Sequence, residues 1–579
     1  MKIVIVGGVA AGMSTAARLR RLDERAEIVV LERDRYVSYA NCGLPYHIGG
    51  DIQDRERLLV VTPEHLRTTL NLDVRTEHEV LAIDRAAKLV SVRERATGRT
   101  YAEAYDSLVL ALGGEPIRPP VPGVDHPRIF TLRSIPDMDR IIARLEAGAR
   151  RAVVIGASYI GAEMVEALRR RGLAVDLVEL QDQIMPLLDR ELAAGLRDHM
   201  LLQGVRLHLG AAAQAFEDRA GGVAVVLGSG ARIEADLVVL AVGVRPAVGL
   251  ARAAGLALGP RGGVQVDAQL RTSDPSIFAA GDMVEVIDSV TGEPAVVALA
   301  GPANRQGRIV ADTLAGRASG YTTTQGTAIV KIFEMTGAIT GASEKRLRAL
   351  GRPYRKIYIH PSGHAGYYPG TAQMQLKLLF APGDGAILGA QIVGFDGVDK
   401  RIDVLATAIR AGMSVFDLER LELAYAPPYG SAKDPVNMAG FVAGNLLRGD
   451  VAFWYAEDYP LASGDALIVD VRGEAEYADW HIDGARNIPL PQLRERLAEL
   501  RELAGGRRVL LYCMVGFRSY LAYRTLAQHG FEGAATLAGG GKTFACYHGA
   551  EPAPATQPPP LISYGEEDLQ AEQALVESD

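Results

Sequence analysis

Cysteine is scarce in this chain, and the small number of thiols excludes several classes of protein. The 579 residues include only Cys42, Cys513 and Cys546, with no CxxC pair. So few thiols argue against a secreted disulfide framework and against a structural zinc site, and we expect no bound metal. No apolar run approaches the length of a transmembrane helix. The apolar start MKIVIV runs into a glycine turn rather than a cleavage site. These absences predict a cytoplasmic protein without membrane segments.

The chain also lacks a strong excess of charge. The net charge is −8, and residues 550–579 hold seven acids and no Lys or Arg, which leaves the rest of the chain close to neutral. A nucleic-acid-binding protein would need a basic face, so no nucleic-acid partner is expected. The same segment is rich in proline, and its composition predicts a disordered acidic tail.

What is present is a repeated unit of strand, turn, helix and strand. The length is too great for one hydrophobic core and predicts three to five domains. The first unit is read as strand 2–6, turn 7–12, helix 13–22 and strand 27–31. The second is read as strand 152–155, turn 156–161, helix 163–171 and strand 174–178. Two such units indicate two nucleotide-binding domains.

Each turn contains the glycines that a dinucleotide site requires. The first turn is GGVAAG and the second is GASYIG, and both lack the middle glycine of GxGxxG. The remaining glycines allow a tight turn, and the helix N-terminus offers N–H groups to a pyrophosphate. Glu32 follows Gly12 by twenty residues, and Glu179 follows Gly161 by eighteen. A carboxylate there binds ribose hydroxyls and repels a 2′-phosphate, which favours NADH over NADPH.

Two further segments carry a resemblance to a known family. The strand SLVLALG (107–113) and the segment TSDPSIFAAGD (272–282) resemble motifs of the pyridine nucleotide–disulfide oxidoreductases. The resemblance spans about residues 1–445 and implies an α/β fold with FAD- and NAD-binding Rossmann-like domains and an α+β dimerisation domain. The expected order is FAD domain 1–150, NAD domain 151–265, FAD domain 266–324, dimerisation domain 325–446, linker 447–460, a further α/β domain 461–549 and tail 550–579.

The resemblance also implies which residues bind the two cofactors. For FAD they are Gly7, Gly8, Val9, Ala10, Gly12, Glu32, Arg33, Asn41, Val80, Ala111, Gly113, Gly281, Asp282 and Ala300. For NADH they are Gly156, Ser158, Tyr159, Ile160, Gly161, Glu179 and Gly243.

Cys42 lies just after the first unit, in the segment SYANCGLPY (38–46), where this family places its redox thiol. A thiol at a helix start beside an oxidised flavin is expected to have a lowered pKa. Glutathione reductase has a second cysteine five positions on, but His47 occupies that position here. This indicates the single-cysteine branch, which contains NADH oxidases, NADH peroxidases and coenzyme A disulfide reductases.

The local sequence is similar to the coenzyme A disulfide reductases. Asn41 precedes Cys42, and LAGPANRQG (299–307) matches the helix that approaches the flavin. The resemblance implies that Tyr367 and Tyr425 reach the active-site sulfur from the partner subunit of a homodimer, where a phenol can donate a proton. The phosphates of coenzyme A need cations, and polar groups could line its pantetheine path. The candidates for binding coenzyme A are Arg18, Arg21, Ser38, Tyr39, Asn41 and Arg305.

Residues 461–549 resemble rhodanese through three motifs in order. These are LIVDVR (467–472) with Glu476, HIDGARNIP (481–489) and VLLYCMVGFRS (509–519). Such a loop curls around its cysteine so that backbone N–H groups face the sulfur. Catalytic Cys513 would thus be surrounded by Met514, Val515, Gly516, Phe517, Arg518 and Ser519, with Arg518 adding positive potential. Cys546 has no motif and is expected to be structural.

Two active sulfurs on one chain indicate one sulfur pathway. The leading prediction is an NADH-dependent, FAD-containing reductase of persulfide or polysulfide, with coenzyme A persulfide as substrate and Cys513 carrying sulfane sulfur. Three alternatives remain open at this point: coenzyme A disulfide reduction, an NADH oxidase or peroxidase that cycles through a sulfenic acid, and a non-redox sulfur-delivery protein.

Overall fold

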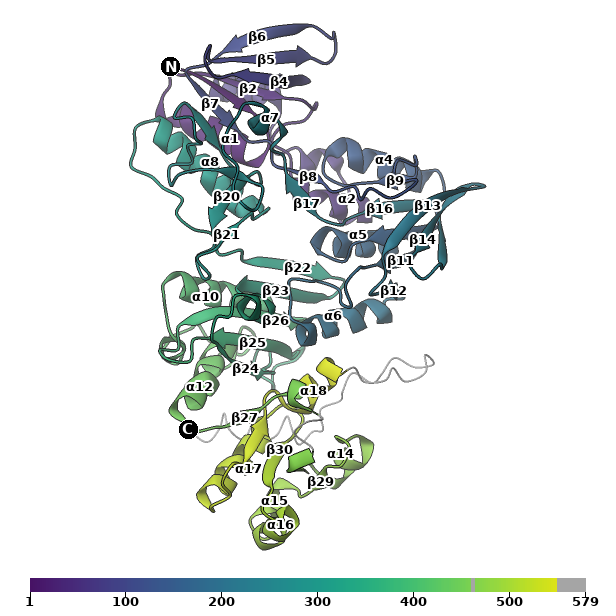
Figure 1. Cartoon of the computed structure of the whole chain (residues 1–579), viewed down its shortest axis with the longest axis vertical. Helices are drawn as coiled ribbons and strands as arrows, with labels where there is room; N and C mark the ends of the chain where they lie inside the picture. The colour runs from purple at the N-terminus through teal and green to yellow at the C-terminus, as the bar shows by residue number, and fades with distance from the viewer. Residues whose placement is uncertain (460–463, 549–579) are drawn as a thin grey trace. The chain divides into compact units, whose positions relative to one another are not determined.

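The computed structural model describes residues 1–459 and 464–548, which form two compact units (Figure 1). The first unit comprises Met1–Asp182 and Val205–Gly326, and the second comprises Gln183–Gly204 and the described residues from Thr327 onward. Segment 183–204, which we placed inside the NAD domain, therefore belongs to the second unit. The expected acidic tail, 550–579, lies outside the described residues.

The first unit begins with a parallel sheet in the order β19-β7-β1-β2-β3. Its strands are β1 (Lys2–Val6), β2 (Glu27–Glu32), β3 (Asp73–Thr76), β7 (Ser107–Leu110) and β19 (Ile277–Ala279). Because side chains alternate along a strand, Ile3 and Ile5 face helices α1 (Ala10–Leu22) and α8 (Ala300–Leu314). Val4 and Val6 instead face the antiparallel strands β4 (His78–Asp84), β5 (Leu89–Glu94) and β6 (Thr100–Ala104).

The same architecture recurs in a second parallel sheet, ordered β12-β11-β10-β16-β9. Its strands are β9 (Ile129–Phe130), β10 (Arg151–Ile155), β11 (Ala174–Val178), β12 (Arg206–His208) and β16 (Leu237–Leu240). Helix α5 (Tyr159–Arg170) follows β10 as α1 follows β1. An antiparallel sheet again packs on one face, with β13 (Ala213–Arg219), β14 (Gly222–Leu227) and β15 (Arg232–Ala235). The two sheets confirm the predicted pair of nucleotide-binding folds.

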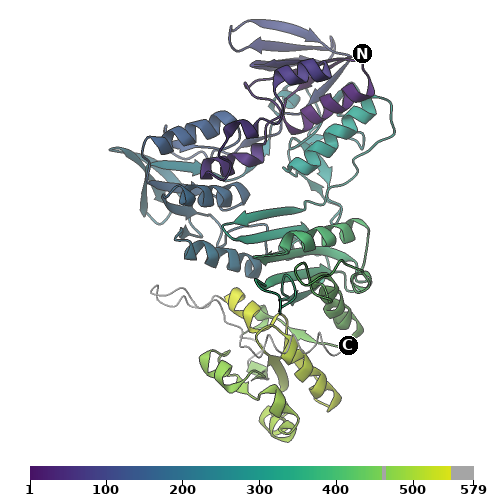
Figure 2. The same ribbon diagram turned by 180° about the vertical axis from the view of Figure 1, so that it is seen from behind.

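Shorter elements complete the first unit. They are η1 (Asn41–Gly43), α2 (Leu44–Gly49), η2 (Arg55–Leu58), α3 (Pro63–Leu70), β8 (Gly114–Pro116), α4 (Ile135–Glu146), β17 (Val244–Pro246), α7 (Gly249–Ala253), β18 (Val264–Gln265), β20 (Val284–Ile287) and β21 (Pro294–Ala295). Helices α1 and α8 lie side by side, as the view from behind also shows (Figure 2). They approach so closely that a Cβ at Gly307 would stand 2.4 Å from the carbonyl oxygen of Ala11. None of the described helices in either unit has the length and apolar character needed to cross a bilayer.

The second unit contains an antiparallel sheet ordered β22-β23-β26-β25-β24. Its strands are β22 (Ala328–Ile332), β23 (Met335–Gly341), β24 (Arg355–Ile359), β25 (Met374–Phe380) and β26 (Ile387–Gly394). Its helices are α6 (Arg190–Leu202), α9 (Glu344–Ala349), α10 (Val398–Arg410), α11 (Val415–Leu418) and α12 (Pro435–Arg448). One face is apolar and packs against α10 and α12. The opposite face carries polar side chains on β24 and β25, among them Tyr358 and its cross-strand partner Lys377.

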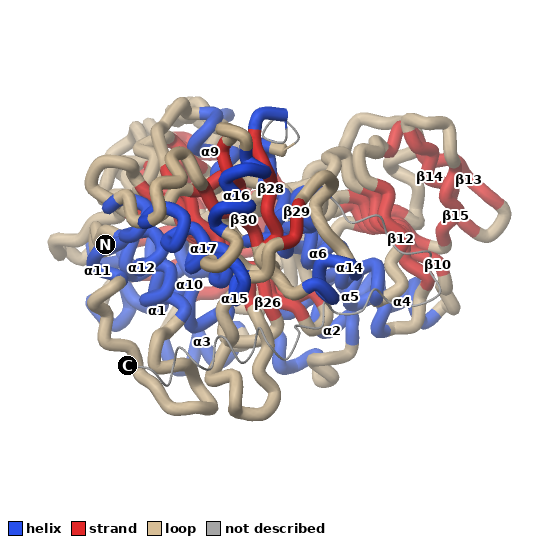
Figure 3. Tube along the Cα trace, turned by 90° about the horizontal axis from the view of Figure 1, so that it is seen from below, coloured by secondary structure: helices blue, strands red, loops and turns tan. Residues whose placement is uncertain are grey.

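The rhodanese domain has a parallel sheet ordered β27-β31-β30-β28-β29, seen among its helices in Figure 3. The strands are β27 (Phe453–Trp454), β28 (Ala466–Asp470), β29 (Arg486–Asn487), β30 (Arg508–Tyr512) and β31 (Ala535–Leu537). The helical elements are η3 (Ala456–Asp458), α14 (Glu474–Asp479), α15 (Leu490–Leu493), α16 (Leu497–Ala504), α17 (Phe517–Gln528) and α18 (Gly540–His548). Strand β27 pairs with β31 and lies within 447–460, where we expected a linker. Part of that segment is thus built into the rhodanese sheet.

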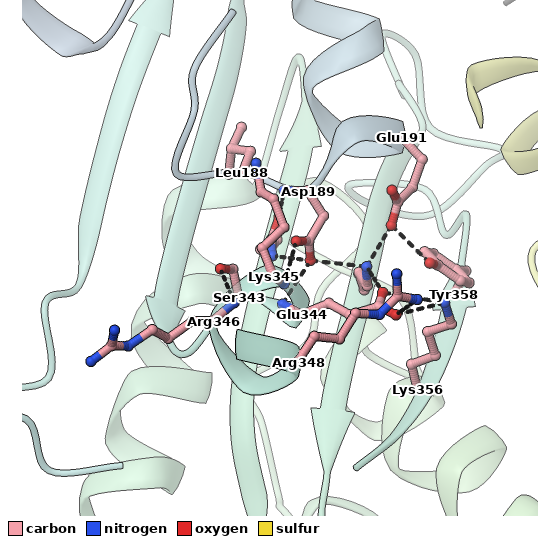
Figure 4. Close-up of polar contacts among 12 residues, drawn as sticks. Leu188, Asp189, Glu191, Ser343, Glu344, Lys345, Arg346, Arg348, Lys356 and Tyr358 are labelled. Carbon is pink, nitrogen blue, oxygen red and sulfur yellow. Dashed lines mark hydrogen bonds and ion pairs between the residues drawn. The ribbon is translucent and has the colours of Figure 1, made fainter. Parts of the chain in front are cut away.

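A buried ion network joins the elements of the second unit (Figure 4). The ammonium of Lys377 is fully buried and lies 2.9 Å from Asp189 Oδ2, 2.5 Å from Glu191 Oε1 and 2.5 Å from Glu344 Oε2. Lys356 binds Glu344 at 3.0 Å and also pairs with Glu457 of the rhodanese domain. A lysine side chain therefore occupies the centre of the three clustered carboxylates and balances part of their charge.

Candidate active site

The first glycine turn, between β1 and α1, has the close backbone contacts of a dinucleotide site. Gly7 adopts a φ of +105°, and a Cβ there would lie 2.2 Å from the carbonyl oxygen of Ala111. A Cβ at Gly12 would lie 1.9 Å from the oxygen of Gly7. Neither position can therefore hold a larger residue without moving the backbone. The turn brings the start of α1 close to the ends of β1 and β7, as pyrophosphate binding requires.

Glu32 stands at the end of β2 and is tied to this turn. Its carboxylate accepts hydrogen bonds from the backbone N–H of Gly8 at 2.8 Å and of Asp34 at 3.0 Å. Burial raises the pKa of Glu32, while these two N–H groups oppose that shift. The carboxylate is thus held at the strand end, where the ribose hydroxyls of a dinucleotide would lie.

The second turn, between β10 and α5, repeats this arrangement. Gly156 adopts a φ of +101°, and a Cβ there would lie 2.3 Å from the oxygen of Ala241. A Cβ at Gly161 would lie 1.9 Å from the oxygen of Gly156. Glu179 accepts a hydrogen bond from the backbone N–H of Ala157 at 2.7 Å. The residues present therefore fit two dinucleotides, one at each turn.

The C-terminal FAD segment meets the first turn in the same unit. Gly281 donates its backbone N–H to Oε1 of Gln306 at 2.7 Å, which ties the segment to α8. Burial raises the pKa of the adjacent Asp282, and Arg133 opposes this shift. Asp282 has no hydrogen-bond donor within 1–459 or 464–548. A desolvated carboxylate without a protein donor fits the expected contact with the ribityl hydroxyls of FAD.

The other predicted cofactor residues lie around these turns. Val9 precedes the first residue of α1, Ala10; Ser158 precedes the first residues of α5, Tyr159 and Ile160; and Ala300 begins α8. Gly113 and Gly243 follow β7 and β16 with positive φ, and Arg33 and Val80 lie beyond β2 and on β4. Their roles in binding remain predictions.

Cys42 lies in the short helix η1 and is exposed. Its backbone N–H donates to Oδ1 of Asn41 at 3.1 Å, and its Sγ lies 3.7 Å from the same oxygen. Partial desolvation raises the pKa of the Cys42 thiol, and the carboxylates of Glu163 and Asp282 raise it further. We expected a lowered pKa, but the protein acts in the opposite direction, because desolvation and, to a smaller extent, the charges of these two acids disfavour the thiolate.

Tyr367 and Tyr425 are brought together in the second unit. They lie in two loops of the dimerisation domain, both side chains are exposed, and their hydroxyl oxygens are 2.9 Å apart. This hydrogen bond raises the pKa of Tyr367. Tyr368 and Tyr429 are also exposed in the same two loops. The two hydroxyls therefore form an exposed hydrogen-bonded pair on the dimerisation domain.

The candidate residues for binding coenzyme A differ in their contacts and in their exposure. Arg18 is held on α1 by Asp312, whose Oδ1 accepts from Nε at 3.0 Å and from Nη2 at 2.9 Å. Arg21 and Arg305 are exposed and form no ion pair with any residue that the structure describes. The remaining candidates differ in exposure: Ser38 (φ +48°) and Tyr39 are half-buried, whereas Asn41 is exposed.

The rhodanese loop follows β30 and leads into α17. Cys513 is buried at the start of this loop, and the backbone N–H of Gly516 donates to its Sγ at 3.2 Å. Gly516 adopts a φ of +102°, which turns its N–H inward. Arg518 binds Glu476 through two hydrogen bonds of 2.7 and 2.8 Å. Although burial alone would raise the pKa of Glu476, Arg518 holds it below its usual value.

The sequence analysis missed two groups near Cys42, Tyr46 and Glu163. The Tyr46 hydroxyl donates to Oε1 of Glu163 at 3.2 Å. The available signal was an acid within the otherwise apolar start of α5, which is unusual on a helix face that packs inside a protein.

Comparison with known proteins assigns the family. Residues 1–307 match the family model of pyridine nucleotide-disulphide oxidoreductases. The chain belongs to this family. Residues 327–434 match the dimerisation domain of the pyridine nucleotide-disulphide oxidoreductases, and residues 458–545 match the rhodanese-like domain. This member of the family is thus a flavoprotein oxidoreductase that uses FAD and NAD(H), with a rhodanese-like domain at residues 458–545.

Two similar proteins of known structure align with most of this chain, including its rhodanese-like part. This oxidoreductase is 45% identical to the reduced CoADR-RHD of Bacillus anthracis, with a TM-score of 0.91 over 94% of this chain and 98% of the other. It is 37% identical to an NAD-dependent persulfide reductase from A. fulgidus, with a TM-score of 0.88 over 94% of this chain and 100% of the other. It is also 35% identical to the coenzyme A disulfide reductase of Staphylococcus haemolyticus, over 77% of this chain and 100% of that protein.

Proposed function

We propose that this oxidoreductase uses NADH to reduce persulfides or polysulfides, with coenzyme A persulfide as its substrate and sulfide as a product. The observation that carries the proposal is the presence of two sulfur sites on one chain. Cys42 is exposed in the short helix η1 of the first unit, and Cys513 lies in a loop where the N–H of Gly516 donates to its sulfur. A reductase of simple disulfides has no need of a sulfane-sulfur carrier. The similarity to an NAD-dependent persulfide reductase, which covers 94% of this chain, also supports persulfide reduction.

Cys42 has no neighbouring cysteine, so its partner sulfur must come from the substrate. Its thiolate attacks the carbon-bound sulfur of the persulfide, the sulfur–sulfur bond breaks, and hydrosulfide leaves as a mixed disulfide forms. When bound, FAD supplies the route by which the electron pair of NADH reaches this disulfide. The disulfide then breaks, Cys42 returns as a thiolate, and the thiol of coenzyme A leaves after taking up a proton. In total, NADH, a proton and the persulfide become NAD⁺, a thiol and hydrogen sulfide.

The paired tyrosines would supply hydrogen-bond donors to the departing sulfur. Because Tyr367 and Tyr425 are exposed on the dimerisation domain, we propose that they act at Cys42 of the partner subunit in a homodimer. A phenol donates a hydrogen bond to a thiolate and so stabilises the developing charge. Arg21 and Arg305 are exposed cations that suit the phosphates of coenzyme A.

Cys513 would carry sulfane sulfur as a persulfide. The N–H of Gly516 and the start of α17 face its sulfur, and both favour a negative charge there. In this proposal Cys513 takes sulfane sulfur from a donor and passes it to coenzyme A or directly to Cys42. Cys513 thus feeds the reductive cycle and is not itself reduced by NADH.

Coenzyme A disulfide reduction is the second candidate. It is favoured by the similarity to a coenzyme A disulfide reductase, which covers 77% of this chain and 100% of that protein. The same Cys42 chemistry would apply, with coenzyme A rather than hydrosulfide as the first leaving group.

The deciding experiment is anaerobic. NADH consumption and sulfide release would be measured with coenzyme A persulfide for the intact enzyme, Cys42→Ser and Cys513→Ser. We expect one sulfide per NADH for the intact enzyme, no turnover for Cys42→Ser and retained turnover for Cys513→Ser. Loss of thiosulfate-dependent sulfur transfer in Cys513→Ser would show that Cys513 carries sulfane sulfur. Turnover with coenzyme A disulfide or oxygen but no sulfide from the persulfide would overturn the proposal.

A further inference from the structure

Lys400 is a cation on the dimerisation domain that the chemistry above does not use. It lies in the first turn of α10, which begins at Val398 after the N-cap Gly397. The helix dipole repels a positive charge at this end, so α10 itself is not stabilised by a lysine there. The side chain reaches out of the helix to the loop between α11 and α12, which carries Tyr425.

Lys400 contacts the backbone on both sides of Tyr425. Its Nζ donates to the carbonyl oxygen of Ala424 at 3.4 Å and to that of Tyr429 at 3.3 Å. The turn that follows Tyr425 is closed by a hydrogen bond of 2.8 Å from the N–H of Tyr429 to the oxygen of Ala426. Because one ammonium group binds a carbonyl before Tyr425 and a carbonyl after it, the backbone from which this side chain projects is restrained.

The same ammonium is anchored in a buried ion cluster. Oδ2 of Asp434 lies 3.5 Å from Nζ of Lys400 and 3.0 Å from Nη2 of Arg401. Asp434 is buried and also caps α12, because it accepts from the N–H of Val436 at 3.0 Å. Arg401 is buried and donates to the carbonyl oxygen of Gly397 at 3.3 Å. The position of the Lys400 ammonium is therefore fixed by two helices and not by the loop that it binds.

The loop that carries Tyr367 is joined to the same place. Gly430 follows Tyr429, and its carbonyl oxygen accepts from the N–H of Ala365 at 3.0 Å. Ala365 lies two residues before Tyr367. The junction is next to the ammonium of Lys400, since a Cβ at Gly430 would stand 3.6 Å from its Nζ. The contact of 2.9 Å between the two tyrosine hydroxyls is thus made by loops that are fastened together beside Lys400.

We propose that Lys400 is a positioning residue that holds Tyr425 within hydrogen-bond distance of Tyr367. This inference rests on the proposed function, in which the two hydroxyls act at the active-site sulfur of the partner subunit. A loop fixes a side chain less precisely than a helix does, so a link from α10 to this loop supplies the precision that the donors need. Lys400 touches neither the substrate nor the reacting sulfur, and it acts through the backbone around Tyr425.

The first test needs no substrate. Hydrogen–deuterium exchange read by mass spectrometry would compare the intact enzyme with Lys400→Met. Methionine has a side chain of similar length without the ammonium, so peptides that cover 361–372 and 421–430 should exchange about 10-fold faster. Peptides that cover 402–410 should be unchanged, which would show that α10 is intact. Unchanged exchange in both loops would overturn the inference.

Two further variants control this measurement. Lys400→Arg keeps a positive charge and several N–H donors, so both loops should exchange more slowly than in Lys400→Met. Lys331→Met is the matched control, because Lys331 is an exposed lysine on β22 in the same unit. Its loops should exchange as in the intact enzyme. Faster exchange of the two loops in Lys331→Met would show that the effect is not specific to Lys400 and would overturn the inference.

The second test asks whether Lys400 acts through Tyr425. Steady-state kcat/KM would be measured with coenzyme A persulfide and with coenzyme A disulfide for Lys400→Met, Tyr425→Phe and the double variant. Lys400→Met should lower kcat/KM about 10-fold in the intact enzyme. In the Tyr425→Phe background the same substitution should cost less than about twofold, because the group that it positions is already gone. Losses that multiply in the double variant would overturn the inference.

Rapid mixing separates positioning from a general loss of structure. Reduction of the enzyme by NADH does not involve the tyrosine hydroxyls in this proposal, so its rate should be the same in Lys400→Met as in the intact enzyme. Only reoxidation by the sulfur substrate should be slowed, again about 10-fold. Equal slowing of both stages would mean that the substitution disrupts the enzyme as a whole, and it would overturn the positioning role.

The outcomes distinguish this inference from the proposed function. If the intact enzyme turns over coenzyme A disulfide but not the persulfide, the proposed substrate fails, and the double variant is read with the disulfide. If Tyr425→Phe is fully active, the role proposed for the tyrosines fails, while exchange still decides whether Lys400 holds their loops. If Tyr425→Phe is impaired and Lys400→Met keeps full activity, the positioning role fails alone.

Discussion

The hydroxyl oxygens of Tyr367 and Tyr425 lie 2.9 Å apart and share one hydrogen bond. The two residues are separated by 58 positions, and the sequence motifs that single them out are independent. Because the bond raises the pKa of Tyr367, this hydroxyl keeps its proton more firmly while Tyr425 is present. The two hydroxyls thus form one hydrogen-bonded pair.

Their joint action predicts that substitutions will not be additive. Tyr367→Phe and Tyr425→Phe should each lower kcat/KM for the sulfur substrate by roughly 10- to 100-fold. The double variant should lose little more than either single variant, because each removes the same unit. Steady-state kinetics of the four proteins would check this. Losses that multiply in the double variant would show that the tyrosines act separately.

Glu179 should determine the choice of nicotinamide cofactor. Its carboxylate accepts hydrogen bonds from the backbone N–H of Ala157 in the second turn and from that of Gln181, and there it would face a 2′-phosphate. In Glu179→Ala the ratio of kcat/KM for NADPH to that for NADH should rise about 10-fold or more, because the repulsion is removed. Gln181→Ala is the control, since only the backbone of Gln181 contacts Glu179. An unchanged ratio would place the 2′-position elsewhere.

Lys377 should be essential to the stability of the second unit. Replacing it with methionine leaves the carboxylates of Asp189, Glu191 and Glu344 without their central cation, at a cost of roughly 3–5 kcal/mol in the free energy of unfolding. Urea unfolding followed by circular dichroism would measure this. The exposed Lys331→Met should stay within about 0.5 kcal/mol of the parent. Equal stability of both variants would mean that the three acids are not all ionised.

The same network predicts a loss of stability in acid. Although burial alone would raise it, Lys377 and Lys356 hold the pKa of Glu344 at about 2, below the usual 4.5. A carboxyl group whose pKa is lower in the folded state than in the unfolded state stabilises the fold at pH values above its unfolded pKa. The contribution of Glu344, roughly 3 kcal/mol, therefore disappears as the pH falls from 4.5 to 2. Thermal melts at successive pH values should show a shallower decline in Glu344→Gln. The exposed Glu24→Gln should retain the slope of the parent.

Gly516 should be required for sulfur transfer but not for reduction. Its positive φ directs its N–H toward Cys513, and an alanine in that conformation is strained by roughly 1 kcal/mol or more. Gly516→Ala should lower thiosulfate-dependent sulfur transfer at least about 10-fold while NADH turnover with coenzyme A persulfide is retained. The two tryptophans of the chain, Trp454 and Trp480, lie in the rhodanese domain, so their fluorescence would confirm that it is folded. Unchanged transfer would show that this N–H does not stabilise the persulfide.

The local elements were largely predictable from the sequence. The predicted strands 2–6 and 174–178 have the same first and last residues as β1 and β11. Each is a short, mostly buried apolar run, which is a clear signal for a strand. Helices α1 and α5 begin three and four residues before the predicted starts. The last glycine of each motif belongs to the helix, since the first helical N–H groups must face the phosphates.

The buried network and the Glu163 site could not be predicted in this way. Lys377 lies in the strand MQLKLLF, where alternation indicates a solvent-facing position, and its partner Glu191 is 186 residues away. The acidity of Glu163 likewise depends on burial and on Tyr46, which lies 117 residues earlier. Such properties arise from tertiary packing, which neither periodicity nor spacing encodes.

Strand β27 and Glu457 limit how the reductase part and the rhodanese-like part can be separated by gene fission. A rhodanese fragment that starts after residue 454 would expose the backbone of β31 as an open sheet edge, which invites aggregation. A reductase fragment that ends at residue 448 would lose Glu457 and leave Lys356 with one fewer counter-charge. An autonomous form of either part would therefore need compensating substitutions at the exposed sheet edge or around Lys356.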